Sequence, residues 1–240
     1  MGNHYLAVSG EFTNEGLMTI RDQGTFIANN TYQQVDGKTT LENGQMYAAG
    51  VEIQGGVFEG TGIVTAESLT NAGEVLPGRS LSTGTLMING AYIQNATGKL
   101  DIELDGPQQT NHDQLATQTA VLAGQLDLSL LDNFVAPVNT SFDIITTLGG
   151  VSGQFDSVYF PEAPQNMAFK LDYSGPNVQV HFVLPTVLGY NDNLGSGAWS
   201  QQNTWLGEIP DTGSDVTITN STTIPQQLNI DINAFAHAVT

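Results

Sequence analysis

The chain has no cysteine and very few basic residues. Without cysteine, a disulfide framework, thiolate chemistry and a thiolate-bound metal site are all excluded. Five Lys and Arg stand against 24 Asp and Glu, which gives a formal net charge of −19. So few cations cannot neutralise a nucleic-acid backbone or follow an anionic lipid surface. The composition therefore argues against nucleic acid and anionic membranes as partners.

Long apolar runs and helical periodicity are also lacking. No stretch approaches the roughly 18 apolar residues of a membrane-spanning helix, so we expect no membrane insertion of this segment. The N-terminus, Met1–Tyr5, lacks the basic region and apolar core of a signal peptide, and we expect a mature piece or fragment of an exported protein. Disorder is disfavoured because 40% of the residues are apolar and β-branched runs recur. The negative charge would keep an extracellular β-rich protein soluble.

Short apolar runs separated by tight turns fill the stretch from Gly55 to Gly106. Val57–Phe58, Gly62–Val64 and Thr85–Ile88 are cut by Gly, Asn-Ala-Gly or Asn-Gly. Gly and Asn accept the positive φ that such turns demand, so the pattern predicts brief strands. The sequence therefore predicts an all-β fold.

An imperfect internal repeat indicates how the strands are arranged. Tyr32–Gln34 followed by Gly37-Lys38 recurs as Tyr92–Gln94 followed by Gly98-Lys99. Thr13–Leu17 is likewise echoed by Thr70–Val75. Repeats of this kind are typical of a β-solenoid, in which each coil buries its apolar face by stacking on the next. A β-sandwich would show similar short strands and is the alternative fold.

Several motifs in fixed order resemble a known family. They are Asn71–Ser80, Gly84–Leu86, Tyr92–Gln94, Leu100–Leu104, Asp113–Leu115, Leu122–Leu126 and Ser152–Phe155. Together they resemble the end of the right-handed β-helix in bacterial autotransporter-type and adhesin-like β-strand-repeat surface proteins. The resemblance covers roughly residues 55–184. It implies a right-handed β-helix closed by an antiparallel sandwich-like cap, with Asn71, Gly73, Pro77 and Gly78 as structural turn residues.

The expected organisation has four parts. Residues 1–98 would form β-solenoid coils, 99–184 a β-rich capping region, 185–198 a polar linker, and 199–240 the start of a second β-solenoid module. The resemblance implies that Trp199 and Trp205 plug the first coil of that module, although exposed tryptophans could instead stack on sugar rings. Inward positions of the second module are expected at Ile224, Leu228, Ile230, Ile232 and Phe235.

The best acidic constellation is Asp101, Glu103 and Asp105, which alternate with Leu100, Ile102 and Leu104. On a strand these carboxylates share one face at about 7 Å spacing, which could hold Ca²⁺ or an acid/base pair. We favour the simpler interpretation of a solvated outer face. A second Ca²⁺ hypothesis involves Asn191–Asn193 with Asp211 and Asp215. The histidines His4, His112, His181 and His237 show no metal-binding spacing.

The sequence therefore predicts a non-enzymatic extracellular structural or adhesive protein at a bacterial cell surface, with no catalytic, cofactor or metal residues assigned. The end Ala236–Thr240 followed by Leu6–Asn14 makes a sensible continuation of one solenoid. We thus expect head-to-tail self-association into a rod or filament, with surface glycans as further partners. The alternative function is a β-helical carbohydrate-active enzyme or carbohydrate-binding module that uses Asp101, Glu103 and Asp105.

Overall fold

The chain folds almost entirely into β-strands. The computed structural model describes residues 4–106, 108, 111–161 and 167–184, and the backbone of the short strands at 186–190, 196–198, 205–206, 214–217, 227–229 and 238–239. These residues contain no α-helix, and Leu131–Asn133 forms a 3₁₀ turn. The predicted all-β class is confirmed. The chain divides into two compact units, one of residues 1–135, 142–161 and 172–179 and one of residues 136–141, 162–171 and 180–240.

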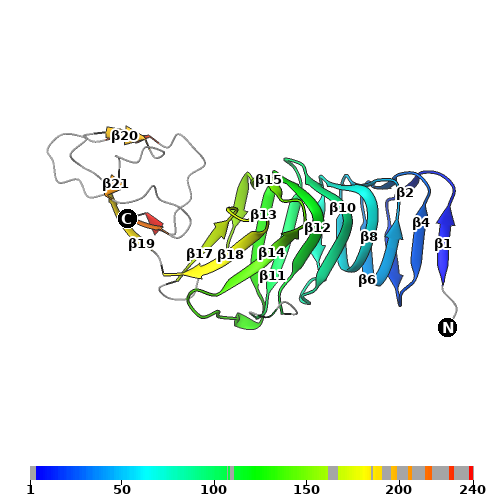
Figure 1. Ribbon diagram of the computed structural model, residues 1–240, viewed down its shortest axis with the longest axis horizontal. Helices are drawn as coiled ribbons and strands as arrows, with labels where there is room; N and C mark the ends of the chain where they lie inside the picture. The colour runs from blue at the N-terminus through cyan, green and yellow to red at the C-terminus, as the bar shows by residue number, and fades with distance from the viewer. Residues whose placement is uncertain are drawn as a thin grey trace. The chain divides into compact units, whose positions relative to one another are not determined.

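The first unit is a single curled sheet whose strands pair in parallel along three rows (Figure 1). Row 1 contains β1 (Tyr5–Val8), β4 (Thr25–Ala28), the second half of β6 (Lys38–Tyr47), the middle of β8 (Val57–Asn71), the first halves of β10 (Thr85–Gln94) and β12 (Gln114–Leu122), and β14 (Ser141–Thr147). Row 2 contains β2 (Phe12–Asn14), β5 (Tyr32–Gln34), β7 (Val51–Ile53), the ends of β8, β10 and β12, and β15 (Val151–Gly153). Row 3 contains β3 (Leu17–Arg21), the first half of β6, the start of β8, β9 (Glu74–Pro77), β11 (Lys99–Leu104), β13 (Gln125–Leu130) and β16 (Ser157–Tyr159).

One passage of the chain through rows 1, 2 and 3 makes a repeat, and the length of a repeat is visible in the pairing register. Tyr5 pairs with Thr25, and Thr25 pairs in turn with Gln45, so the first two repeats are equally long. Further along, Leu115 pairs with Ile145, and that repeat is half as long again. The added residues lie in the segments 78–84, 105–113 and 131–140, each of which connects row 3 to row 1. The later repeats therefore lengthen at one corner of the sheet while all three rows continue.

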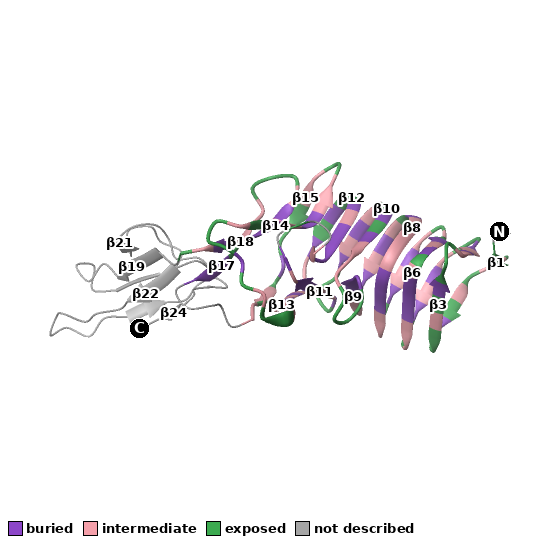
Figure 2. Ribbon diagram, turned by 90° about the horizontal axis from the view of Figure 1, so that it is seen from below, coloured by how far each residue is buried: buried purple, intermediate pink, exposed green. Residues whose placement is uncertain are grey.

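The core lies between the three rows. Alternate residues are buried in strands such as β4, β5 and β7, which gives the striped pattern of Figure 2. Phe26 of row 1, Tyr32 of row 2 and Leu41 of row 3 are each almost fully buried. The rings of Phe26 and Tyr32 meet edge to face with centroids 5.8 Å apart. The apolar side chains of the rows thus pack on one another, and burial stabilises the fold by about 1.5–3 kcal/mol for each large side chain.

Glycines stack at the corner where row 2 turns into row 3. Gly37 and Gly56 have φ of +73° and +66°, which glycine adopts readily. A Cβ on Gly37 would lie 2.2 Å from the carbonyl oxygen of Gly16, and a Cβ on Gly56 would lie 2.2 Å from that of Gly37. Six glycine carbonyls in this column accept a main-chain hydrogen bond from the following repeat: Gly16, Gly37, Gly56, Gly73, Gly98 and Gly124. We call these six residues the glycine column.

Buried side-chain amides line the inner side of the same corner. Asn14 pairs in register with Gln34 in row 2, and Asn71 pairs with Gln94. The Asn71 amide donates to the Lys99 carbonyl at 2.9 Å, and the Gln94 amide donates to the Ala123 and Gln125 carbonyls at 2.9 and 2.8 Å. These bonds satisfy main-chain acceptors of the next repeat, which would otherwise be buried without a partner.

The two sequence repeats that predicted stacking occupy equivalent places. Tyr32 and Tyr92 are both buried in row 2, two residues before the buried Gln34 and Gln94. The sequence also predicted an antiparallel cap from residue 99 onwards. In the structure, β11 and β13 pair in parallel, as do β12 and β15, so the rows continue across residue 98 as far as Tyr159. Alternating Leu and Ile residues face inward equally well in either arrangement, and the alternation alone could not separate them.

The second unit contains most of β17 (Ala168–Asp172) and β18 (Val178–Val183), and six short strands. The rings of Phe169 and Phe182 pack edge to face with centroids 4.6 Å apart. The six strands are β19 (Thr186–Tyr190), β20 (Ser196–Ala198), β21 (Trp205–Leu206), β22 (Ser214–Thr217), β23 (Gln227–Asn229) and β24 (Ala238–Val239). β19, β22 and β24 pair in parallel in that order, β20 pairs in parallel with β23, and β21 pairs antiparallel with β19.

Replacing Gly56 tests the glycine column. Gly56→Ala introduces a Cβ at a positive φ and against the Gly37 carbonyl, so we expect a loss of roughly 2 kcal/mol or more in the free energy of unfolding. Gly50→Ala is the matched control, because a Cβ at Gly50 meets nothing within 4 Å. The control should change stability by less than about 0.5 kcal/mol. Urea unfolding followed by circular dichroism measures both, and equal effects would contradict a special role for the column.

Candidate functional site: the open N-terminal end and the acidic face

The first repeat has core residues that nothing in the described part of the chain covers. Leu6 pairs in register with Phe26, and both occupy inward positions of row 1. Phe26 is 1% exposed, whereas Leu6 is 58% exposed. A parallel row places equivalent side chains directly above one another. The difference between the exposed fractions of Leu6 and Phe26 therefore shows how much of Leu6 a further repeat would bury. The first repeat thus ends the described sheet with an apolar face.

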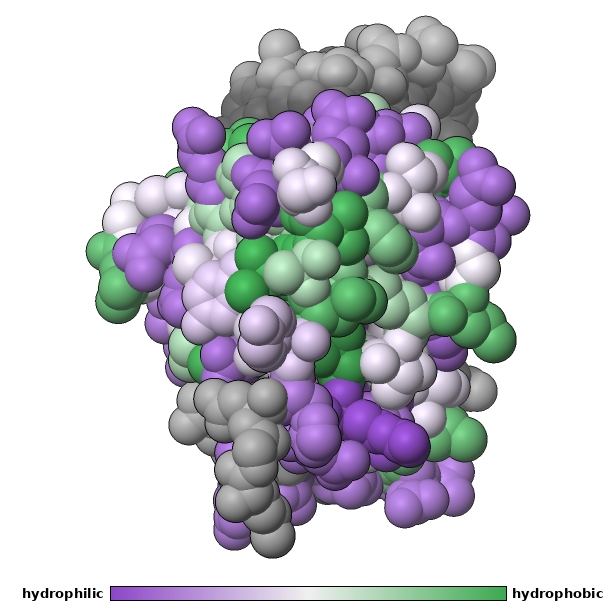
Figure 3. Space-filling view, turned by 90° about the vertical axis from the view of Figure 1, so that its right-hand side faces the viewer, coloured by the Kyte–Doolittle hydropathy of each residue, from purple (hydrophilic) through white to green (hydrophobic). Residues whose placement is uncertain are grey.

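Figure 3 shows this face, which we call the open end. Apolar side chains gather in its middle and polar side chains surround them. Its strands are β1, β2 and β3, and in the described residues each of them pairs on one side only, with β4, β5 and β6 respectively. The open end therefore combines an uncovered core with three strand edges that offer main-chain donors and acceptors. An apolar patch with a polar rim is characteristic of an interaction surface.

An aromatic cluster of the first two repeats packs directly behind the open end. The ring of Phe12 lies 5.0 Å from that of Phe26, edge to face, and 5.8 Å from that of Tyr32, nearly parallel. The Tyr32 hydroxyl hydrogen-bonds the Thr39 hydroxyl. Burial raises the pKa of Tyr32, and the bonds to Thr39 and Asn14 only partly oppose that effect, so the phenol remains neutral. Close packing of this kind gives the end a fixed shape.

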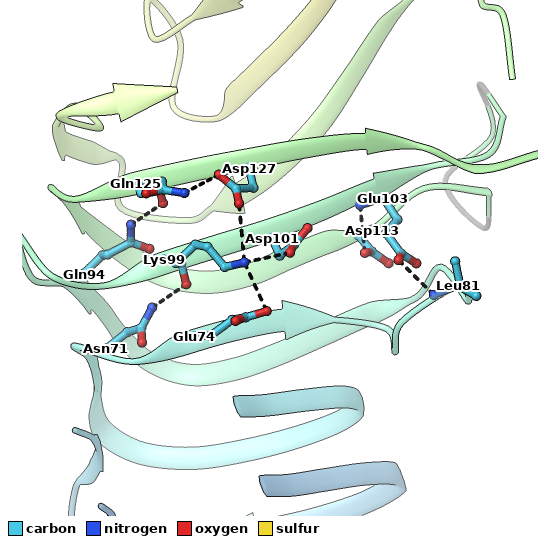
Figure 4. A network of polar contacts seen from close by, with 10 residues as sticks. All are labelled: Asn71, Glu74, Leu81, Gln94, Lys99, Asp101, Glu103, Asp113, Gln125 and Asp127. Carbon is cyan, nitrogen blue, oxygen red and sulfur yellow. Dashed lines mark hydrogen bonds and ion pairs between the residues drawn. The ribbon is translucent and has the colours of Figure 1, made fainter. Parts of the chain in front are cut away.

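The acidic residues singled out in the sequence have separate structural partners, and Figure 4 shows those of Asp101 and Glu103 on row 3. Asp101 lies beside Lys99, whose ammonium is 3.2 Å from its Oδ2. Glu103 is 6% exposed and accepts main-chain hydrogen bonds from Leu81 and Ser82 at 2.8 and 3.0 Å. Asp105 is half-buried and donates its main-chain N–H to the Asn111 carbonyl at 2.8 Å. Asp101 and Glu103 share a face as predicted, but their carboxylates contact different groups, and the expected solvated face is wrong at Glu103 because this side chain is buried under the segment 78–84.

Lys99 is the centre of an ion cluster that links three repeats. Its ammonium lies 3.3 Å from Glu74 Oε1, 3.2 Å from Asp101 Oδ2 and 3.4 Å from Asp127 Oδ2. Partial burial alone would lower the pKa of Lys99, but the carboxylates, Asp101 foremost, raise it above the usual value. Lys99 therefore stays charged and offsets repulsion between acidic side chains of successive strands.

Other cations are placed in the same way. Lys38 lies 2.7 Å from Glu59, and Arg79 lies 2.6 Å from Glu42. Each pair joins one repeat to a later or earlier one, so these cations strengthen stacking. We call the surface that carries these ion pairs and the Lys99 cluster the acidic face; its cations connect carboxylates of different repeats.

Two buried carboxylates, Glu103 and Asp113, hold the segment 78–84 against row 3 (Figure 4). Asp113 is fully buried and accepts main-chain hydrogen bonds from Gly84 at 2.8 Å and from Glu103 at 3.0 Å. We call Glu103 and Asp113 the carboxylate latch. Burial raises the pKa of Asp113 to about 8, against the opposing effect of the two hydrogen bonds and with the help of the nearby Glu103 and Asp101 charges.

The surface of the first unit has, among its described residues, an apolar and a polar hollow. One is mainly apolar and is lined by residues of row 1 and the turn after it, including Met87, Ala116, Thr117 and Leu148. The other is polar and lies at the corner between rows 3 and 1; its lining is Asp22, Glu42, Asn43, Thr61, Gly78, Arg79 and Ser82. Neither of these two hollows is lined by a member of the predicted acidic triad or by Asp113.

Of the other residues that the sequence singled out, some lie within the residues that the structure describes and some lie outside them. His112 is buried and lies 3.0 Å from the Gln108 carbonyl and 3.3 Å from the Asp143 carbonyl, which makes it part of the packing. Across the described residues, no group of three or more His, Asp or Glu side chains is arranged to hold a metal ion. These candidates lie outside the described residues: Asn191–Asn193, Trp199, Asp211, Ile224, Ile230, Ile232, Phe235 and His237. Trp205, Asp215 and Leu228 lie in β21, β22 and β23, of which only the backbone is described.

Sequence reasoning missed two structural groups. It included Asp113 only in a motif of the resembled family and gave it no partner, because the bonds to Gly84 and Glu103 depend on three-dimensional stacking. It also treated the glycines as separate turns. Their shared signal is that each glycine of the column is followed, two positions later, by an inward residue such as Thr39, Phe58 or Leu100.

No helix in the described residues is long and apolar enough to cross a membrane.

The carboxylate latch predicts a specific pH dependence. Because folding raises the pKa of Asp113 from 3.8 to about 8, this group stabilises the fold fully below about pH 4 and the contribution is lost as pH rises through 8. We expect the free energy of unfolding to fall by roughly 1–3 kcal/mol between about pH 5 and pH 8, and Asp113→Asn to flatten that slope. Asp22→Asn, at a carboxylate 91% exposed, is the control and should keep the parental slope. Urea titrations at several pH values measure the slopes, and a parental slope in Asp113→Asn would assign the effect to other groups.

A comparison of the chain with protein-family models and with curated proteins finds no match. The two features that stand out are an apolar end with three strand edges and an acidic face whose charges hold successive repeats together.

Proposed function

We propose that this chain is a non-enzymatic structural module of an extracellular rod, elongated by end-on stacking. In this proposal the curled sheet is a right-handed β-solenoid of the kind found in the bacterial surface proteins that the sequence resembles. Three parallel rows, a pairing register that advances by one repeat at a time and a glycine column at one corner all support a solenoid. A right-handed path is the usual one for parallel strands joined by crossovers.

The open end is the observation that carries the proposal. In a solenoid each repeat covers the core of the one before it, so a terminal repeat needs a cap or a neighbour. The strands of the open end have the sequences YLAV, FTN and LMTIR; they contain no Pro, and Arg21 at the end of β3 is their single charged residue. Proteins that keep their strand edges apart commonly place several charged residues, Pro or a bulge there. The edges of this end are thus suited to pairing with a further strand.

Charge sets the conditions under which stacking would occur. Each chain carries −19, so two chains repel one another at low ionic strength. The Debye length is about 10 Å at 0.1 M salt and shorter at higher salt, which weakens this repulsion. Burial of apolar surface and main-chain pairing at the ends are insensitive to screening. Association should therefore strengthen as salt is added.

A second candidate function is glycan binding, either as a carbohydrate-binding module or as a carbohydrate-active enzyme. The polar hollow favours it, because carboxylate, amide, hydroxyl and guanidinium groups of Glu42, Asn43, Thr61 and Arg79 line it together. Such groups can hydrogen-bond sugar hydroxyls. Catalysis by the predicted acidic triad is less well supported, since Asp101 contacts Lys99 and Glu103 accepts two main-chain bonds.

Self-association of the purified chain tests the leading proposal. We expect the mass measured by light scattering to grow with protein concentration in about 0.5 M salt, where screening is strong, and negative-stain images to show rods. Leu6→Lys puts a charge into the apolar centre of the open end and should reduce association at least about tenfold.

Leu148→Lys is the matched control, because Leu148 is 83% exposed and lies away from β1–β3 in a turn after β14. This variant should associate like the parent, and thermal unfolding checks that both variants are folded. A parental chain that stays monomeric at every concentration and salt would overturn end-on stacking and direct attention to the glycan hypothesis.

A further inference from the structure

We propose that the open end of one copy binds strand β24 of a second copy, so that association is head to tail. This inference rests on the end-on stacking proposed above and names the surface that the open end takes. The alternative arrangement is a pair of open ends facing each other.

The direction of the strands favours the head-to-tail arrangement. Along each row of the first unit, every new repeat adds a parallel strand on the same side of the previous one. β1, β2 and β3 therefore present the side on which an earlier strand would lie. β24 is the last strand of the order β19, β22, β24 and presents the side on which a later strand would lie. A parallel row can be extended only by joining these two unlike sides, whereas two open ends that meet face to face cannot extend one.

The C-terminal strands repeat at a spacing similar to that of the first unit. Thr186 pairs with Ser214, and Asp215 pairs with Ala238. Both steps along the chain lie between the shorter and the longer row 1 repeats given above. The pairing of β20 with β23 advances by a step only slightly longer than the longer of those repeats. The segment that ends in β24 thus has the parallel, repeating form that a further repeat can join.

The sequences at the two edges match. Ala238-Val239-Thr240 resembles Ala7-Val8-Ser9 residue by residue in size and polarity. Rows in this protein place like beside like, as with Leu86 and Leu115 or Leu100 and Leu126. Setting β24 beside β1 in this register pairs Ala238 with Ala7 and Val239 with Val8, and neither strand carries a charge.

The backbone of β1 has main-chain groups that could form hydrogen bonds with β24 of a second copy. The carbonyls of His4 and Val8 accept hydrogen bonds from Thr25 and Asn29, at 2.9 and 3.0 Å, and so point toward β4 and the chain that follows it. In a parallel pair alternate residues point to opposite sides, so the N–H and C=O of Ala7 point away from β4. Ala7 is exposed, and its main-chain groups lie on the side where the second copy would bind.

The geometry has a consequence for assembly. An interface between two different surfaces of identical chains either forms a ring or continues without limit. Continuation without closure would give a filament in which each copy binds the next through the same pair of surfaces. Two open ends facing each other would give only a dimer.

Cysteine cross-linking in the full-length chain distinguishes these arrangements. The parent contains no cysteine, so a short bis-maleimide joins only introduced thiols. We would prepare Ala7→Cys and Ala238→Cys separately and treat each alone and in an equimolar mixture, with Leu148→Cys in place of Ala7→Cys as the control for random collision. Cross-linked dimers are expected in the mixture only, at least about tenfold above the Leu148→Cys mixture, because the contact holds the two thiols together.

Dimers formed by Ala7→Cys alone, or no cross-link in a mixture whose light scattering shows association, would overturn the head-to-tail inference and leave end-on stacking intact. Absence of association in the parental chain would instead overturn the proposed function itself. Ala7→Pro gives an independent check, because it removes an N–H that the monomer does not use. This variant should unfold at the parental temperature and associate at least about tenfold more weakly; parental association would count against β1 as the contact.

Discussion

The close approach of the main chain at the corner between rows 2 and 3 is the constraint on which this fold depends. A glycine carbonyl of one repeat accepts a hydrogen bond from the next, and at Gly37 and Gly56 there is no room for a side chain between them. That spacing fixes the register of each repeat. Because side chains alternate along a strand, the register then decides which residues enter the core and which face solvent. The buried amides of Asn71 and Gln94 complete the corner by satisfying carbonyls of the following repeat.

The same register explains the use of charge in a chain with so few cations. Lys99 meets three carboxylates only because Glu74, Asp101 and Asp127 come from strands stacked in row 3. Glu103 and Asp113 are held by main-chain donors of neighbouring segments. Asp101 and Glu103, which the sequence offered for catalysis or Ca²⁺ binding, thus contact groups of neighbouring segments. The strongly acidic composition contributes to architecture, and its excess charge remains as repulsion between whole chains.

The sequence predicted the strands, their alternation and the equivalence of Tyr32–Gln34 with Tyr92–Gln94, because these signals are local. It did not predict that residues 99–159 continue the parallel rows, since the inward pattern of Leu100, Ile102 and Leu104 has the same period in a parallel or antiparallel strand. The partners of Asp113 were also out of reach, because they are distant along the chain and meet it only through stacking. Leu6 could not be identified as an exposed core residue, because its exposure depends on which repeat lies beyond it.

The connections from row 3 to row 1 differ from the other two corners in a way that bears on how such a protein can change. Residues 78–84, 105–113 and 131–140 vary in length while the rows on either side keep their pairing. Loop closure costs only about 0.6 kcal/mol for each doubling in length, so insertions at this corner are inexpensive. The glycine-lined corner has no such freedom. One edge of the molecule can therefore diversify, or accept a grafted peptide, while the opposite corner preserves the register of the whole stack.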